Sequence, residues 1–277
     1  MDKNRIDAVA SDIVEGIRQA LVKHNVTFDE YRAGVMYAVK TANAGEIPLM
    51  LDVFLNSTIS DIENAAFGGT EGTIEGPYYL PDAPVIPNGG EVRTYQDDRN
   101  IPMIVRGTVR DLDGHPIESA AVDIWHSTPD GYYGGFHNNV PADYYRGKVL
   151  TDADGKYSVR STLPVPYKIP DQGPTGALLE LMGRHSWRPA HVHFKVRADG
   201  FHTLTTQSYF EGEAYVDDDC CTAVRSIQVK ADVRENGAKV IENDFQLAPE
   251  ASARRTEITN RSCPHCRRRC QCDQSRA

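Results

Sequence analysis

The segment RPAHVHFKVR, residues 188–197, predicts a β-strand that decides the architecture of the chain. Apolar and polar residues alternate along it, and residues two apart in a strand point to the same face. Its valines and phenylalanine therefore face a core, while His191 and His193 project together from the other side. Two imidazoles at that spacing form half of a metal site, although a pair of surface or hydrogen-bonded histidines also explains the motif.

Further strands of this kind follow one another from about residue 100 to residue 250. Period-two alternation recurs in Ile104–Arg110, Ala120–His126 and Lys156–Ser161. Short turns rich in Asp and Gly lie between such segments, as at residues 111–114 and 152–155. We therefore predict a mainly β fold whose core is an antiparallel β-sandwich or a related barrel.

The DADG turn at residues 152–155 also has the spacing of calcium-binding carboxylates. An EF-hand loop that began at Asp152 would need glycine at its sixth position, where Tyr157 stands. This mismatch favours a simple turn.

The first 60 residues have helical periodicity. An apolar stripe with spacings of three and four residues runs along residues 3–23, at Ile6, Val9, Ile13, Ile17 and Leu21. Such a stripe predicts an amphipathic helix whose apolar face must be covered. The capping box that begins at Thr27 and includes Glu30 predicts a second helix through about residue 41, and we expect a third over residues 46–56.

The composition is that of a globular chain. Of 277 residues, 40% are hydrophobic and 25% are charged, which excludes a wholly disordered or collagen-like chain. The net charge of -9 disfavours nucleic-acid binding through the whole surface. The longest apolar run, Ile47–Leu55, is interrupted by Asp52 and is far shorter than the ~20 residues of a membrane span. Because the N-terminal residues also lack an apolar signal core, we expect a cytoplasmic protein.

Changes in composition divide the chain into three parts. Four prolines within residues 77–87 end the helical region, so we expect a helical domain with its connection at 1–85 and a β-sandwich domain at 86–250. Residues 251–277 hold seven Arg, one Glu and one Asp, and we expect a basic, disordered tail. Four cysteines lie there, at Cys263, Cys266, Cys270 and Cys272, and a zinc site is the alternative to an unstructured extension.

Two tyrosines in the predicted β region have distinctive surroundings. Tyr133 follows a Pro-Asp-Gly turn at the end of a strand, and Tyr167 lies in the stiff segment LPVPYKIP, residues 163–170. Phenolate oxygen is a hard donor that suits a trivalent iron, which would favour ionisation of the phenol. Spacing alone does not establish that these tyrosines meet the two histidines.

Several motifs, taken in order, identify a family. They are DIWH at 123–126, GYY at 131–133, YRG at 145–147, LPVPY at 163–167, GPT at 173–175, GRH at 183–185, RPAHVH at 188–193 and LTTQ at 204–207. Together with IEGPY at 74–78, they resemble the intradiol ring-cleavage dioxygenases over about residues 1–250.

The resemblance implies an enzyme with one non-haem Fe(III) per subunit. Its ligands would be Tyr133, Tyr167, His191 and His193, with hydroxide completing the coordination sphere. The enzyme would cleave a catechol with O2 between the two hydroxyl-bearing carbons, give a cis,cis-muconate, and need no external electron donor. Tyr167 would yield its place to the substrate and accept its protons.

Two further residues receive catalytic roles from the resemblance. Arg188 would stabilise negative charge that develops on the reacting ring, and Gln207 would orient the oxygen-derived group. A permanent guanidinium charge suits the first role. A surface salt bridge is the ordinary alternative for Arg188.

The resemblance also implies a substrate pocket. Its residues would be Leu49, Asp52, Val53, Ile74, Gly76, Pro77, Tyr78, Ile169, Pro170 and Cys221. Several of these match the branch of the family that cleaves chlorinated catechols, and a polarizable thiol suits a chlorine neighbour. Preference for catechol or hydroxyquinol is the alternative. The N-terminal helices resemble the dimerisation domain of the family, which encloses phospholipid, whereas packing against the sheet explains their stripe equally well.

Two other functions are compatible with the motifs. A prealbumin-like sandwich could bind small aromatic molecules without catalysis, with structural histidines. A zinc or copper enzyme could use the HxH pair, but it would leave Tyr133 and Tyr167 without a role. Iron content separates the dioxygenase from both.

Overall fold

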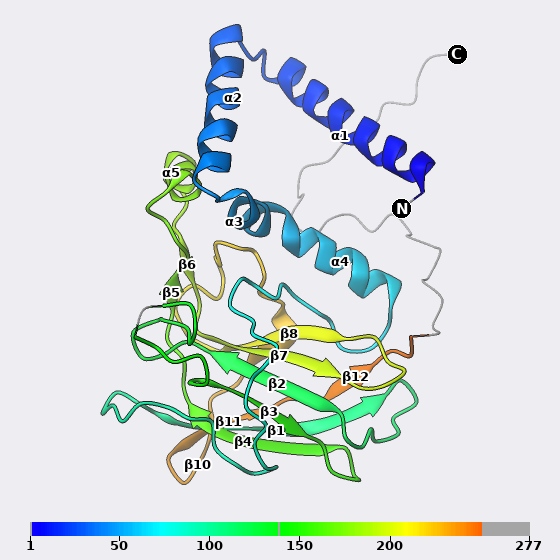
Figure 1. Ribbon diagram of the computed structural model, residues 1–277, viewed down its shortest axis with the longest axis vertical. Coiled ribbons are helices and arrows are strands. Elements are labelled where there is room, and N and C mark those ends of the chain that lie inside the picture. The colour runs from blue at the N-terminus through cyan, green and yellow to red at the C-terminus, as the bar shows by residue number, and fades with distance from the viewer. Residues whose placement is uncertain (1, 138, 251–277) are drawn as a thin grey trace. The chain divides into compact units, whose positions relative to one another are not determined.

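A computed structural model of the chain describes residues 2–137 and 139–250 (Figure 1). These residues form two compact units, one of residues 2–51 with 170–186 and the other of residues 52–169 with 187–250. The sequence-based division at residue 85 is a different partition and stays a prediction. The expected tail, with its four cysteines and the possible zinc site, lies outside the described residues.

The first unit is helical. Its helices are α1 (Lys3–Lys23), α2 (Phe28–Asn43), α3 (Ile47–Leu51) and α5 (Pro174–Leu181). The predicted capping box is present, because Thr27 Oγ1 accepts a hydrogen bond from the Glu30 amide and Glu30 Oε2 accepts one from the Thr27 amide at 2.7 Å. Helix α5 was not predicted. It is held to α2 and the turn after it, since Tyr37 Oη donates to the Pro174 carbonyl and Glu46 accepts from the Thr175 amide.

The apolar stripe of α1 is exposed. Ile6, Val9, Ile13 and Ile17 are 46–58% exposed, and no residue of α1 is buried. The predicted helix is confirmed, but the expected cover of its stripe does not come from the described residues of this chain.

The second unit begins with the π-helical segment η1 (Asp52–Asn56) and helix α4 (Ser57–Ala66). Thus the helix predicted over residues 46–56 comprises α3 and η1. The strands that follow are β1 (Pro102–Asp111), β2 (Ala121–His126), β3 (Arg146–Leu150), β4 (Lys156–Thr162), β5 (Tyr167–Lys168), β6 (Trp187–Arg188), β7 (His191–Arg197), β8 (Leu204–Phe210), β9 (Val229–Lys230), β10 (Val233–Glu235), β11 (Ala238–Glu242) and β12 (Phe245–Leu247).

Most of these strands form two sheets (Figure 1). One sheet has the order β10-β11-β1-β12, with β4 paired to β1, and the other has the order β3-β2-β7-β8-β9. The predicted β-sandwich is confirmed, but it is not wholly antiparallel. Strand β1 pairs in parallel with β11 and β12, and β8 pairs in parallel with β9. Alternation along a strand reports which face is buried and not the direction of its neighbour, so the sequence could not reveal these pairings.

Side chains from both sheets meet in one hydrophobic core. The register sets Ile124 of β2 opposite Phe194 of β7, so these apolar residues share the inner face, whereas Trp125 and His193 face the other side. Phe194 of β7 packs on Phe245 of β12, with ring centroids 5.3 Å apart. The prediction that the valines and phenylalanine of β7 face a core is therefore confirmed.

The turn at Asp152 has the predicted form. Asp152 Oδ1 accepts hydrogen bonds from the amides of Asp154 and Lys156, at 3.0 and 2.8 Å. The carboxylate therefore completes a turn with its own backbone. Across the described residues, the helices are too short or too polar to cross a membrane.

Candidate metal centre and active site

The two histidines of β7 point toward each other. Their Nε2 atoms are 2.9 Å apart, and each residue is 1% exposed. The Nδ1–H group of His191 donates to the Pro189 carbonyl at 2.7 Å, which leaves the Nε2 lone pair of the neutral ring to face His193. The His193 ring stacks on Trp125, with centroids 4.6 Å apart. Two ring nitrogens held this way have the arrangement that metal-binding histidines need.

The two tyrosines join the histidines in one buried cluster. Tyr133 lies in the loop after β2, and its ring centroid is 5.3 Å from that of Tyr167 in β5. The ring centroids of Tyr167 and His191 are 5.5 Å apart, and those of Tyr133 and His193 are 6.0 Å apart. The fold therefore brings together the four side chains that the sequence left unconnected.

Burial dominates the electrostatics of the cluster. It raises the pKa of the Tyr133 and Tyr167 phenols above their ordinary value and lowers the pKa of His191 and His193 well below theirs. Neutral imidazole is the form that binds metals. For the phenols, a cation reverses the effect of burial, because it favours the phenolate.

One unpartnered polar atom in the cluster fits the presence of a metal ion. Within the described part of the chain, Tyr133 Oη is buried and has no hydrogen-bond partner of ordinary geometry, and its nearest polar neighbour is the Tyr167 phenol. A buried polar atom without a partner is costly unless something else satisfies it. The Tyr133 oxygen, beside a second phenol and two imidazole nitrogens, completes the mixed oxygen and nitrogen donor set that a non-haem Fe(III) would take.

Arg188 and Gln207 lie directly beside this cluster. Arg188 Nη1 is 3.2 Å from His191 Nε2, and Nη2 donates to Gln207 Oε1 at 3.0 Å. Gln207 Nε2 in turn donates to the Ile74 carbonyl at 2.6 Å. The alternative interpretation of Arg188, a surface salt bridge, is wrong, because this residue is 2% exposed and faces the cluster.

Sequence reasoning missed two residues of the network. Tyr209 Oη donates to Gln207 Oε1 at 2.7 Å and accepts from Arg188, and the Asp219 carboxylate pairs with the Arg188 guanidinium. Tyr209 follows Gln207 by two residues in β8, so period two alone would have placed both on one face. For Asp219 no local signal exists, since its partner is 31 residues away.

Four predicted pocket residues are tied to the cluster. Tyr78 stacks on Tyr133 with centroids 4.4 Å apart and meets Tyr167 edge-on at 6.2 Å. Gly76 has a φ of +69° and lies so near His193 that an added Cβ would be 3.6 Å from the imidazole ring. The buried Ile74 bonds to Gln207 through its carbonyl, and the buried Ile169 follows Tyr167 closely in the chain.

Of five other predicted pocket residues, three belong to the same unit as the cluster and two belong to the first unit. Val53 is buried in η1, and the neighbouring Asp52 accepts a hydrogen bond from Asn56 of the same segment. Burial raises the pKa of the Asp52 carboxyl. Pro77 is exposed in the second unit. The half-buried Leu49 and the exposed Pro170 belong to the first unit.

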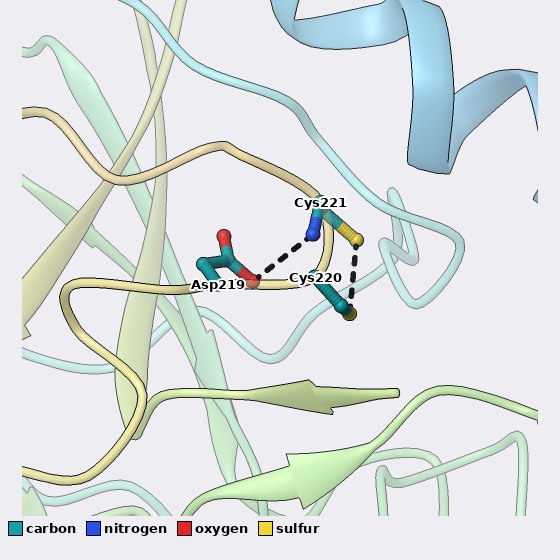
Figure 2. A group of neighbouring side chains, drawn as sticks. All are labelled: Asp219, Cys220 and Cys221. Carbon is teal, nitrogen blue, oxygen red and sulfur yellow. Dashed lines mark hydrogen bonds between the residues drawn. The ribbon is translucent and has the colours of Figure 1, made fainter. Parts of the chain in front are cut away.

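Cys221, the remaining pocket residue, belongs to a compact group with Asp219 and Cys220 (Figure 2). All three are buried, and one potential ligand atom from each lies within 4.8 Å of the others. The two thiols form no disulfide, since their sulfur atoms are 3.8 Å apart.

Comparison with known proteins identifies the family. A family model described as Dioxygenase matches residues 74–249, and one described as Catechol dioxygenase N terminus matches residues 3–70. The chain is 52% identical to a chlorocatechol 1,2-dioxygenase of Pseudomonas sp. (strain P51), over 88% of this chain and 96% of that protein. It is 50% identical to a chlorocatechol 1,2-dioxygenase of Pseudomonas putida, over 94% and 98% respectively. The crystal structure of a chlorocatechol 1,2-dioxygenase from Pseudomonas putida superposes with a TM-score of 0.85 at 51% identity, covering 89% of this chain and 99% of that one.

The β-sandwich, the helical N-terminal region and the two matching family models together define a dioxygenase. The chain belongs to the intradiol catechol dioxygenase family, whose members use non-haem Fe(III). The resemblance inferred from its motifs is thereby confirmed.

Proposed function

We propose that this chain uses one non-haem Fe(III) to cleave chlorinated catechols with O2 into chloro-cis,cis-muconates. The ion would be held by Tyr133, Tyr167, His191 and His193. The observation that carries the proposal is the convergence of these four buried side chains from a loop and two separate strands. A prealbumin-like binding protein would not need an unpartnered phenol oxygen beside two facing imidazoles, and a zinc or copper enzyme would leave both phenols without a role.

Fe(III), when bound, supplies Lewis acidity that withdraws electron density from a chelated catecholate and opens its ring to O2. The protein must then accept protons and hold charge. Tyr167 Oη is the group proposed to take a substrate proton. Burial raises the pKa of its phenol, and the nearby Arg188 charge opposes that rise. Bound to the ion, Tyr167 would be a phenolate. Because burial raises the pKa of the free phenol, that phenolate would take a proton from the substrate when the substrate replaces it.

Arg188 is proposed to stabilise negative charge on the reacting ring. Its guanidinium is buried, so its field is screened little by water. Gln207 is fixed by bonds to Arg188, Tyr209 and the Ile74 carbonyl, so its amide is held in one orientation. A fixed amide can orient a reacting oxygen without reorganising during the reaction.

The buried residues around the cluster support a chlorinated substrate. Ile74, Tyr78, Ile169 and Cys221 are 3–8% exposed and bring no formal charge. Such a wall offers apolar and polarizable contacts for chlorine, and Asp52 is the one charged residue of the predicted pocket that could bind a third hydroxyl group. The relatives described above as chlorocatechol 1,2-dioxygenases agree with this preference. Preference for catechol or hydroxyquinol is the alternative.

The experiment compares catechol, 3-chlorocatechol, 4-chlorocatechol and hydroxyquinol side by side. We expect O2 consumption, ring-opened muconate products, and kcat/KM for the chlorocatechols at least equal to that for catechol. Extradiol products or no O2 consumption by the iron-loaded protein would contradict the reaction. Much lower kcat/KM for both chlorocatechols than for catechol or hydroxyquinol would contradict only the substrate preference.

We further propose a homodimer formed through the first unit. The exposed stripe of α1 and exposed residues of α2, among them Phe28 at 71% and Met36 at 64%, offer a large apolar surface. Bound phospholipid would cover part of the same surface. Light scattering gives the mass in solution, and mass spectrometry of an organic extract detects lipid. A monomer without lipid would contradict both proposals. The cytoplasmic location stays a proposal that fractionation of the source cells tests.

A further inference from the structure

Arg188 has a buried counter-ion, Asp219. Nε of the guanidinium lies 3.1 Å from Asp219 Oδ1, and Nη2 lies 3.2 Å from Oδ2. The side chains of the two residues are 2% and 1% exposed. A two-point contact between planar groups fixes orientation as well as distance.

The contact uses one edge of the guanidinium and leaves the other free for the site. With Nε and Nη2 held by Asp219, Nη1 is directed to His191 Nε2 at 3.2 Å. Nη2 also donates to Gln207 and Tyr209. The carboxylate therefore determines which nitrogen of Arg188 faces the metal-binding cluster.

Asp219 is itself held in place. The amides of Cys221 and Ala223 donate to its carboxylate at 3.3 and 3.0 Å, and Figure 2 shows the first of these bonds. The Cys220 amide donates to the carbonyl of Trp187, the residue before Arg188. The chain thus folds around the carboxylate and attaches this loop to β6.

The same three residues could be taken for a metal site, but their chemistry favours the counter-ion. Both Asp219 oxygens already bond to Arg188 and to backbone amides. The hydrogen bond with Cys221, together with burial, raises the pKa of the Cys220 thiol, and a protonated thiol is a poor metal ligand. An ion at Asp219 would also compete with the guanidinium.

We propose that Asp219 is a positioning residue for catalysis, which holds Arg188 with Nη1 toward the metal-binding cluster. This inference rests on the proposed function. The Asp219 carboxylate connects Arg188 to the loop that carries Cys221, a predicted pocket residue. Asp219 acts only through Arg188, so its effect on turnover should disappear when the guanidinium is absent.

The test is a double-mutant cycle on the full-length, iron-loaded enzyme with Asp219→Asn, Arg188→Ala and the combined variant. We expect Asp219→Asn to lower kcat at least tenfold, with KM changed less than threefold and with iron content unchanged. In the Arg188→Ala background, the Asp219→Asn substitution should change kcat less than twofold. The low kcat of the Arg188→Ala variant is measured at high enzyme concentration. Asp219→Glu tests the geometry, because a displaced carboxylate should restore only part of kcat.

Asp123→Asn is a matched control. Asp123 is also a buried carboxylate of the second unit, paired with Arg197 and Lys148. Its loss should lower the melting temperature and leave kcat within twofold. Equal losses of kcat for Asp219→Asn with and without Arg188 would overturn the proposal, as would an unchanged kcat in the single variant.

The same double-mutant cycle, measured by thermal unfolding, distinguishes a failure of the proposed dioxygenase function from a failure of the positioning role of Asp219. If the wild type shows no catechol cleavage, the proposed function fails, and the unfolding cycle still reports whether the pair is coupled. If Asp219→Asn does not fold, Asp219→Glu replaces it in both cycles. An active wild type in which Asp219→Glu has normal kcat would contradict the positioning role alone.

Discussion

Tyr167 and Arg188 are opposite one another in the two-stranded sheet β5–β6, a pairing that places a candidate metal ligand directly across from the candidate catalytic cation. Each of the two strands has only two residues. The antiparallel register therefore sets the distance between the phenol and the guanidinium without a flexible linker. This pairing gives a physical reason to assign them separate tasks, with proton transfer at Tyr167 and charge stabilisation at Arg188.

Arg188→Ala should retain iron and fold but lose turnover. The guanidinium donates to the cluster without being one of the four proposed ligands, so its charge acts on the chemical step. We expect kcat to fall by about 100-fold or more, of the size seen when one preorganised electrostatic group is removed. Stopped-flow kinetics with iron analysis measures this. Normal kcat at full iron content would rule out the role.

His191→Ala and His193→Ala should each lose iron. Removing one of the four proposed protein ligands weakens the site. Metal analysis after dialysis checks the stoichiometry. His115→Ala is the control, because this histidine is 74% exposed and lies in a turn at Asp111. Full iron retention by either cluster variant would show that its histidine is not a ligand.

Enlarging Cys221 should penalise chlorocatechols more than catechol. Cys221 is 4% exposed, so a bulkier side chain such as Phe must take space from its neighbours. One chlorine-sized group in an apolar pocket is worth about 1–3 kcal/mol, or about 10–200-fold in kcat/KM. The ratio of kcat/KM for 4-chlorocatechol to that for catechol is the readout. A variant that loses activity equally on both substrates would place Cys221 outside the chlorine contact.

Acid should destabilise the fold through His126. This residue is buried, with its ring nitrogens bonded to the Ser127 carbonyl and Ser161 Oγ, and burial lowers its pKa to about 4. Below an unfolded pKa of about 6.5, the unfolded chain binds a proton that the folded one refuses, so stability is lost as the pH falls from about 6.5 to about 4. The free energy of unfolding should fall by about 3 kcal/mol over this range, at about 1.4 kcal/mol per unit of pKa difference. Urea unfolding at several pH values measures it, and His126→Gln should flatten the slope by that amount.

Deleting residues 251–277 should leave iron content and kcat unchanged. Both family matches end before this segment, at residues 70 and 249. Side-by-side kinetics of the full and shortened chains checks the expectation. A loss of iron on deletion would give the four cysteines of the segment a role in the metal site.

The sequence predicted the helices and strands that have strong periodicity. It did not predict the short elements between them or the pairing of distant strands. Strand β7 and helix α1 were evident from alternation and from the apolar stripe. The two residues of β5 carry no periodic signal, and α5 begins at a proline that is equally common in turns. The direction of β11 relative to β1 depends on contacts between residues more than 100 positions apart, which no local pattern reports.

The site divides in the same way. The HxH spacing made His191 and His193 candidates by itself. The surroundings of Tyr133 and Tyr167 made them candidates too, but only the family resemblance connected them to the histidines. The convergence of the tyrosines with the histidines depends on the register of β5 with β6 and on the path of the loop after β2. No local sequence pattern reveals either feature. The ion pair of Arg188 with Asp219 was invisible for the same reason, because it joins a strand to a distant loop.

The central claim is that Tyr133, Tyr167, His191 and His193 hold one Fe(III). The most direct measurement is metal analysis of the purified chain combined with its visible absorption spectrum, before and after anaerobic addition of 4-chlorocatechol. We predict one iron per chain, a red to burgundy colour from tyrosinate-to-iron charge transfer, and a shift of that band when the catechol binds. A colourless, catalytically active protein that holds zinc and no iron would contradict the claim.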